Sequence, residues 1–220
     1  MGMELISSSP AVTIRRAAVS SMDNNVYLIT SRTTGRQILI DAANEPDTIS
    51  AMIASAKDDG PAPTIDLIIT THCHADHIGA LAEMVRRTGA PTAAGRDDAQ
   101  SITQQTGVIV DRLLDNGGSV GVDGIELAVI GLRGHTPGSV ALAYSEPGYP
   151  IHLFSGDSLF PGGVGNTNHD PARFASLFSD VSTRIFDVYP DDTVVHPGHG
   201  KPTTLGTERP HLIEWQQRGW

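Results

Sequence analysis

The apolar positions near the start of the chain occur in short runs separated by turn-forming residues. The runs are Val12–Ile14, Val26–Thr30 and Gln37–Ile40, and the breaks between them include Asp23–Asn25 and Thr34-Gly35. Runs rich in β-branched and aromatic residues, bounded by Asn, Asp and Gly, are typical of strands joined by turns. The pattern therefore predicts antiparallel strands here, and it makes Asn24 and Asn25 turn formers rather than site residues.

A different spacing follows, and it predicts a helix, a buried strand and a second helix. Within Asp47–Lys57 the apolar residues recur at helical spacing, and Gly60-Pro61 ends the segment. Ile65–Thr70 is a continuous apolar run that predicts a buried strand, and Ile78–Arg87 predicts the next helix. The strand runs directly into a histidine-rich loop, Thr71–His77. Such strand ends commonly carry active sites.

The second half repeats this order of elements without repeating the sequence. The predicted strands are Ile125–Ile130, Val140–Tyr144, Ile151–Phe154 and Thr193–Val195, and the predicted helices are Pro171–Val188 and roughly Leu205–Gln217. No linker-like stretch separates the halves, so we expect one α/β domain over residues 1–220, an αββα body. Trp215 and Trp220 are expected to cover core surface.

Composition places the chain among ordinary globular proteins and limits the classes of partner that it is expected to bind. It has 220 residues, of which 39% are apolar and 18% charged, and its net charge is −10. A surface of that charge repels a phosphate backbone, and the pairs Arg15-Arg16 and Arg86-Arg87 are too small to form a basic groove. Apolar runs such as Leu67–Ile69 are far shorter than the roughly 20 residues of a membrane-spanning helix. We expect neither a nucleic-acid nor a membrane partner.

The single cysteine and the first residues favour a cytoplasmic location. Cys73 is the only cysteine, which excludes an internal disulfide. Met1–Arg16 lacks the apolar core and cleavage site of a secretory signal.

The loop Thr71–His77 contains four side chains that bind metal ions well. His72, His74, Asp76 and His77 offer imidazole and carboxylate ligands suited to zinc, iron or manganese. In extended backbone, residues two apart project to the same side, so His72 and His74 can share one ion, and the following turn lets Asp76 and His77 face a second. Cys73 then points the other way, and we interpret it as a buried packing residue.

Three further potential ligands lie at loop entries beside glycines that permit close approach of the backbone. They are His135 in Gly134–Gly138, Asp157 in Ser155–Asp157 and His199 in Pro197–Gly200. The remaining histidines, His152, His169, His196 and His211, are interpreted as structural or surface residues. Of these, His196 is the strongest candidate for a partner that holds a metal-bound imidazole, because it lies three residues before His199.

Four ordered motifs, THCHADHIG, GHTPGS, GDSLFPGGVGN and HPGHG, give the chain a family resemblance over nearly its whole length. The chain resembles the metallo-β-lactamase superfamily, and most of all its glyoxalase II-type hydrolase branch. The resemblance implies an αββα sandwich in which two mixed β-sheets are flanked by helices.

The resemblance also implies a binuclear metal centre. In it, one ion is bound by His72, His74 and His135, a second by Asp76, His77 and His199, and Asp157 bridges them. Two divalent ions are expected, zinc first, with iron or manganese as alternatives. A metal-bound hydroxide then attacks a small-molecule thioester or ester, such as a hydroxyacyl-thiol conjugate, and Asp76 orients the nucleophile or handles a proton.

Other functions within and outside this family remain open. A persulfide dioxygenase keeps one iron on the equivalents of His72, His135 and Asp157, but the motifs GDSLFPGGVGN and HPGHG favour the hydrolase. A β-lactamase of the main type would place a cysteine near Asp157, and a lactonase would need substrate elements that are not found. A non-catalytic metal-binding scaffold predicts loss of ligands, whereas all seven are present.

Two departures argue against glutathione as the thiol carrier. Asn166 stands where such hydrolases usually have lysine or arginine, and the chain ends at Trp220, soon after His199. Long-form glyoxalase II enzymes carry an additional helical domain there, with basic residues for the glutathione carboxylates. Another low-molecular-weight thiol is therefore a possible carrier.

Overall fold

The structure is a computed structural model that describes residues 2–219, and a seven-stranded mixed sheet holds its first half. The strands lie in chain order: β1 (Met3–Ser8), β2 (Val12–Val19), β3 (Asn24–Ser31), β4 (Arg36–Ile40), β5 (Thr64–Thr70), β6 (Thr92–Gly95) and β7 (Arg112–Leu114). Strands β1 to β4 are antiparallel, and β4 to β7 are parallel. The parallel strands bring the ends of β4, β5 and β6 to one edge of the sheet.

The second half forms a six-stranded mixed sheet in the order β15-β14-β11-β10-β9-β8. Its strands are β8 (Ser119–Val122), β9 (Ile125–Gly131), β10 (Val140–Tyr144), β11 (His152–Gly156), β14 (Val194–Pro197) and β15 (Thr203–Thr204). Only β11 and β14 are parallel neighbours among these six strands. A small ribbon of β12 (Leu159–Phe160) and β13 (Gly163–Val164) follows β11.

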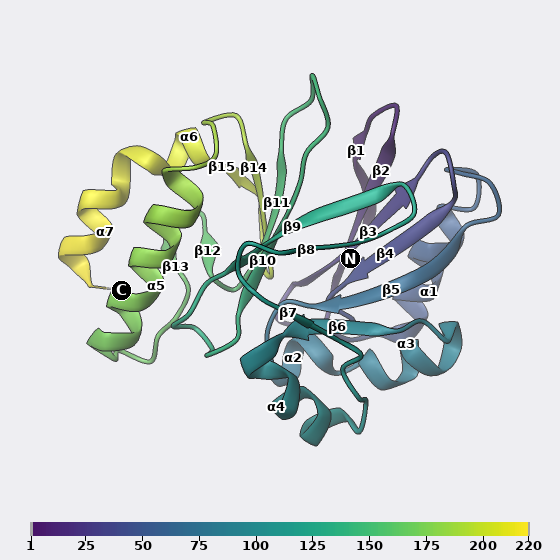
Figure 1. Cartoon of the computed structure of the whole chain (residues 1–220), viewed down its shortest axis with the longest axis horizontal. Coiled ribbons are helices and arrows are strands. Elements are labelled where there is room, and N and C mark those ends of the chain that lie inside the picture. The colour runs from purple at the N-terminus through teal and green to yellow at the C-terminus, as the bar shows by residue number, and fades with distance from the viewer. Residues whose placement is uncertain (1, 220) are drawn as a thin grey trace.

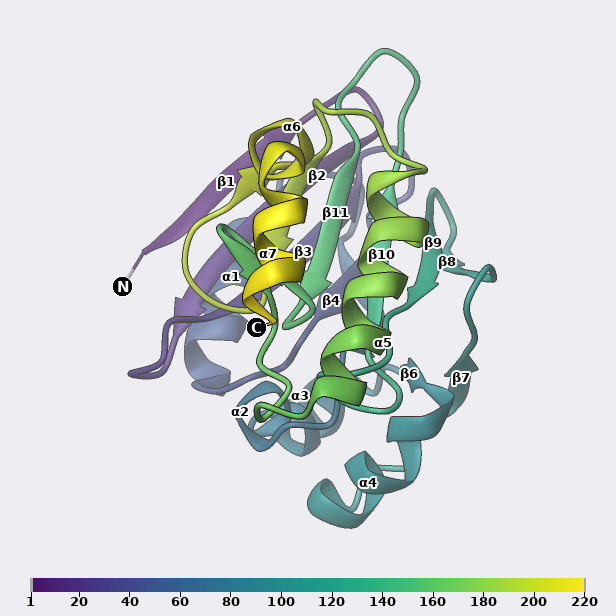
Figure 2. The same ribbon diagram turned by 90° about the vertical axis from the view of Figure 1, so that its left-hand side faces the viewer.

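Helices cover the outer faces of both sheets, which gives four layers (Figure 1). The helices of the first half are α1 (Pro46–Ser55), α2 (Ala75–Ile78), α3 (Leu81–Thr88) and α4 (Arg96–Thr106). Those of the second half are α5 (Pro171–Val181), the π-helix η1 (Ser182–Phe186), α6 (Leu205–Glu208), the 3₁₀-helix η2 (Arg209–His211) and α7 (Leu212–Arg218). Figure 2 shows α5 and α7 lying across the second sheet. The predicted αββα sandwich with two mixed sheets is confirmed.

Alternation along the strands sorts apolar side chains into three packed layers. In β5, Leu67 and Ile69 belong to the cluster between the two sheets, whereas Ile68 belongs to the cluster beneath α1 and α3. Successive side chains of a strand point to opposite faces, so a strand buried on both sides is apolar throughout. Trp215 is buried in the third cluster, as expected, and Trp220 lies outside the described residues.

The predicted elements are present, and the differences have local causes. The helix expected over Ile78–Arg87 is divided into α2 and α3, and the one expected over Pro171–Val188 ends as the π-helix η1. The helix expected over roughly Leu205–Gln217 is divided into α6, η2 and α7. The helix α4 was not predicted because its only buried apolar residues are Ala99 and Ile102. None of the helices within residues 2–219 is long and apolar enough to cross a membrane.

Candidate metal centre

All seven side chains proposed as ligands lie together where strands end at the edge of the sandwich. His72 and His74 follow β5, Asp76 and His77 lie in α2, His135 lies between β9 and β10, Asp157 follows β11, and His199 follows β14. Both sheets therefore contribute ligands to the site, and the packing of the two sheets brings the four loops that carry these ligands together.

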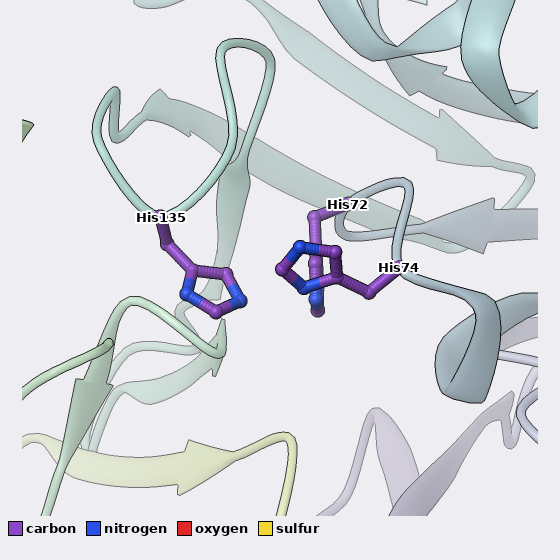
Figure 3. A group of neighbouring side chains, drawn as sticks. All are labelled: His72, His74 and His135. Atoms are coloured by element: carbon purple, nitrogen blue, oxygen red, sulfur yellow. The ribbon is translucent and has the colours of Figure 1, made fainter. Parts of the chain in front are cut away.

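One group of ligand atoms is formed by three histidines. Figure 3 shows His72 and His74 reaching from the loop after β5 toward His135, which comes from the opposite loop. Their ring centroids lie 4.5 to 4.8 Å apart. One nitrogen from each ring lies within 4.8 Å of the others, which is a geometry that could hold one metal ion.

A second group combines one carboxylate with two histidines. Nε2 of His199 lies 3.2 Å from Oδ2 of Asp76 and 3.2 Å from Nε2 of His77. Nε2 of His77 lies 3.6 Å from the same carboxylate oxygen. These three side chains could also hold a metal ion.

Asp157 lies between the two groups. Its Oδ1 is 3.3 Å from Nε2 of His77, and its Oδ2 is 3.4 Å from Nε2 of His199 and 3.7 Å from Nε2 of His135. With His72 and His77 it makes a third set of atoms close enough for an ion. The Asp157 carboxylate therefore lies within reach of both groups of ligand atoms.

The site contains buried polar atoms that a cation would satisfy. Nε2 of His72, Nε2 of His135 and Oδ1 of Asp157 are buried, and none has a hydrogen-bond partner among the residues that the structure describes. An unsatisfied buried polar group costs about 1–3 kcal/mol. The three atoms are acceptors or can be acceptors, and they come from three different loops. The donor set therefore fits metal binding.

Two of the histidines are held neutral. Burial lowers the pKa of His72 well below its ordinary value, and the charge of His77 lowers it further. Burial likewise lowers the pKa of His135. Neutral imidazole is the form that coordinates a metal ion, so the three-histidine group needs no proton removed from these two rings.

Around the second group the carboxylates attract positive charge. Burial lowers the pKa of His77, but the Asp157 and Asp41 carboxylates outweigh it and raise that pKa to about 10. Asp157 also raises the pKa of His199. Burial alone would raise the pKa of Asp157, yet the His199 and His77 imidazoles hold it well below its usual range. Positive charge is thus strongly favoured between these side chains.

Hydrogen bonds from Nδ1 of three of the rings fix the orientation of those rings, so that Nε2 faces the other proposed ligands. Nδ1 of His77 donates to Asp41, Nδ1 of His135 to the Asn166 carbonyl, and Nδ1 of His199 to the Met22 carbonyl, at 2.7 to 2.9 Å. A carboxylate or carbonyl can only accept, so each Nδ1 carries a proton, and Nε2 is the nitrogen of each ring that faces the site and could bind a metal ion after losing any proton of its own. Such partners orient metal-binding imidazoles.

One interpretation from the sequence is wrong, and another is confirmed only in part. Asn24 is fully buried at the site, where its Nδ2 donates to Oδ2 of Asp76 at 2.9 Å, so it is more than a turn former. Cys73 is half-buried rather than fully buried. It packs against the cluster beneath α1 and α3, and with His74 and His135 it also lines a cavity of about 650 Å³.

The structure agrees with the interpretation of His196 as a structural residue, and none of its contacts among the described residues is to a proposed ligand. His196 is buried against Tyr27 and Phe154, and its Nε2 lies 2.8 Å from Nδ1 of His152. The side chains that do support the site, Asp41 and Asp98, were not identified from the sequence. Asp41 directly follows a predicted strand, and a polar residue at a strand end could have indicated a residue of the site.

The family model for the metallo-beta-lactamase superfamily matches residues 22–199, which contain all seven ligand positions. The chain belongs to the metallo-beta-lactamase superfamily. Its metal-ligand motifs and its fold agree with that membership, and the coarse chemistry of the family is that of a metallohydrolase.

Similar proteins include hydroxyacylglutathione hydrolases. Hydroxyacylglutathione hydrolase GloC of Haemophilus influenzae is 27% identical over 66% of this chain and 73% of its own length. A hydroxyacylglutathione hydrolase of Anaeromyxobacter dehalogenans is 35% identical over 80% of this chain, but the match spans only 61% of that enzyme. The crystal structure of TTHA1623 in a di-iron-bound form has a TM-score of 0.65 and 30% identity, covering 88% of this chain and 96% of that one.

Proposed function

We propose that this protein is a binuclear metallohydrolase that cleaves a small-molecule thioester or ester, such as a hydroxyacyl-thiol conjugate. The observation that carries the proposal is the convergence of seven ligand side chains on two adjacent groups with Asp157 between them. The similarity to hydroxyacylglutathione hydrolases supports the thioester as substrate.

We assign the first ion to His72, His74 and His135, the second to Asp76, His77 and His199, and both to Asp157. Zinc suits imidazole and carboxylate ligands, and iron or manganese would suit them as well. When bound, such ions lower the pKa of a coordinated water and polarise a carbonyl oxygen.

The protein's own groups prepare the site for hydrolysis. Asp76 is the most exposed of the carboxylates here, with 28% of its side chain accessible, so it faces the open side of the site. Asn24 holds one of its oxygens, which leaves the other to orient a water molecule or accept its proton. No serine or cysteine nucleophile is required.

The cavity beside His74 and His135 supports a carrier with few negative charges. Its lining includes Pro137, Ala172 and Ser176, and its one permanent cation is Arg173. The Arg173 guanidinium already donates to the carbonyls of the Gly134-His135 segment. A carrier with two carboxylates would therefore find little to pair with in this cavity.

The direct test counts metal ions and compares two reactions. The protein is purified without added metal, its ions are counted by elemental analysis, and it is assayed at once on a hydroxyacyl-thiol ester and on a persulfide. Two divalent ions per chain with thioester hydrolysis is the expected result. One iron per chain with oxygen consumption on the persulfide would replace the proposal by a dioxygenase.

A ligand variant and a matched control sharpen this test. His72→Ala should lose at least about 100-fold in activity, since it removes a ligand from the first ion. The metal-free variant should stay folded, because Nε2 of His72 has no partner among the described residues. His211→Ala, at a histidine with 55% of its side chain exposed, should keep full activity. A folded His72→Ala variant with full metal content and activity would refute the ligand assignment.

A further inference from the structure

A buried carboxylate outside the seven ligands connects the two loops that carry the three-histidine group. Asp98 lies in the first turn of α4 and is only 1% exposed. Its Oδ2 accepts hydrogen bonds from the Cys73 amide at 3.0 Å and from Oγ1 of Thr136, and its Oδ1 accepts one from the Gly138 amide at 2.8 Å. Cys73 lies between His72 and His74, and Thr136 follows His135.

The packing of α4 against these loops leaves little room for adjustment. A Cβ on Gly95, which precedes α4, would come within 1.9 Å of the Gly138 carbonyl oxygen. A Cβ on Gly138 would come within 2.3 Å of the Asp98 amide nitrogen. Backbone therefore packs directly on backbone here, and the Asp98 carboxylate is held close to the loop that follows His135.

Asp98 uses both of its carboxylate oxygens as hydrogen-bond acceptors. Two of its three partners are backbone amides, which can only donate, and the hydroxyl of Thr136 completes the set. Charge-assisted bonds of this kind are about twice as strong as neutral ones. An asparagine of the same shape would turn its own N–H groups toward at least one amide donor and would leave that amide unsatisfied.

The second group is held by other residues. His77 is bonded to Asp41, His199 to the Met22 carbonyl, and Asp76 to Asn24. None of these contacts involves Asp98. Asp98 thus makes no contact with the side chains of the second group, although Asp157 lies between the two groups and Asp41 also bonds Thr71, which precedes His72.

We propose that Asp98 is a positioning residue that sets the spacing of the two histidine loops and thereby the metal affinity of the group His72, His74 and His135, without setting that of Asp76, His77 and His199. This inference rests on the metal binding proposed above and is independent of the thioester substrate. Asp98 touches neither substrate nor metal, and it acts through the Cys73 amide and the 136–138 backbone.

The test is a metal titration of Asp98→Asn. The full chain is stripped with a chelator and titrated with Co²⁺, following heat and the visible absorption of the bound ion. His135→Ala shows which binding step belongs to the three-histidine group, because that step is lost in it. In Asp98→Asn we expect this step to weaken about 10- to 100-fold and the other to change by less than about two-fold.

Two further variants keep the test decisive. Thr136→Val removes one bond to Asp98 at constant shape and should weaken the same step by a smaller factor, which allows a test even if Asp98→Asn does not fold. Asp59→Asn is the matched control, because Asp59 accepts bonds from Thr13 and Arg15 far from the site. It should leave both steps unchanged.

The inference is overturned if a folded Asp98→Asn protein binds metal at the three-histidine group as tightly as the wild type. If Asp98→Asn does not fold, the same result in Thr136→Val overturns it. Equal weakening of both steps overturns it as well, since that would be general loosening of the fold. A wild-type protein that binds two ions but cleaves no thioester would refute the substrate proposal only. The selective loss in Asp98→Asn would then still be observed.

Discussion

Nδ1 of His77 donates to Oδ2 of Asp41 across 2.9 Å, and this bond connects α2 to the residue that follows β4. Asp41 follows β4, and its carboxylate also accepts from the amide and the hydroxyl of Thr71, which follows β5. The Asp41 backbone has a φ of 56°, a left-handed conformation that costs energy in a residue other than glycine. Such strain persists where surrounding contacts fix it.

Replacing this carboxylate should damage the second metal-ion group. In Asp41→Asn, the His77 imidazole loses its ionised acceptor, and the Thr71 amide competes for the one remaining oxygen. We expect metal affinity of the group Asp76, His77 and His199 to fall about 10- to 100-fold. Metal titration of the chelator-treated protein measures this. Asp66→Asn, a more exposed position on β5, should behave like the wild type.

The fold could be predicted largely because its strands are continuous apolar runs with turn residues at their ends. Runs such as Ile65–Thr70 and Val140–Tyr144 agree with β5 and β10 to within a residue. The elements that were not predicted have little apolar periodicity. α4 buries only two apolar side chains, and β1 is an edge strand with exposed Met3 and Leu5. Their positions are set by tertiary contacts.

In the candidate site too, some residues could be predicted from the sequence and others could not. Ligand residues can be recognised from their types and their spacing in motifs, because a metal ion needs specific donor atoms. Supporting residues need only one suitable atom at the right place, so Asp41, Asp98 and Asn24 are ordinary residues in the sequence. Asn24, at the start of β3, forms a β-bridge with His199 and also bonds Asp76, and neither contact can be read from its place in the sequence.

Asn24 provides the second prediction. Its side-chain amide donates to Asp76 and helps to lower the pKa of that carboxyl, although burial opposes this as the largest single effect. In Asn24→Ala, the Asp76 carboxylate is free to rotate, and we expect kcat to fall about 10- to 100-fold with the fold retained. Steady-state kinetics and circular dichroism measure the two effects. Asn116→Ala, at an asparagine that bonds the Gly131 amide, is the control, and equal activity of both variants would exclude a role for Asn24.

Gly198 is predicted to be essential because of the space around it. A Cβ at this position would lie 2.2 Å from Oδ1 of Asp157 and 2.6 Å from Cε1 of His77. Gly198→Ala must therefore displace two proposed ligands, and we expect loss of metal from the centre and activity near background. Elemental analysis and the hydrolysis assay measure this outcome. In Gly118→Ala the added Cβ meets only one atom, at 3.3 Å, so activity should be unaffected. Full metal content in Gly198→Ala would contradict the prediction.

The buried pair His152 and His196 predicts how stability changes with pH. Burial, and then the charges of His152 and Arg16, lower the pKa of His196 to about 3. Burial also lowers the pKa of His152. An unfolded histidine has a pKa of about 6.5. Below that pH, His196 therefore binds a proton in the unfolded chain but stays neutral in the folded chain. The stabilisation from a neutral His196 is complete above pH 6.5 and is lost as pH falls toward 3.

Because of His196, we expect the free energy of unfolding to fall by about 2 kcal/mol as the pH is lowered from 6.5 to 5. His196→Gln cannot take up the proton, so its loss over this range should be smaller by about that amount. Urea unfolding of the metal-free proteins at the two pH values measures the difference. His211→Gln, at an exposed histidine, should follow the wild type. If His196→Gln and the wild type lost equal stability, the buried ring would not be the group that takes up the proton on unfolding.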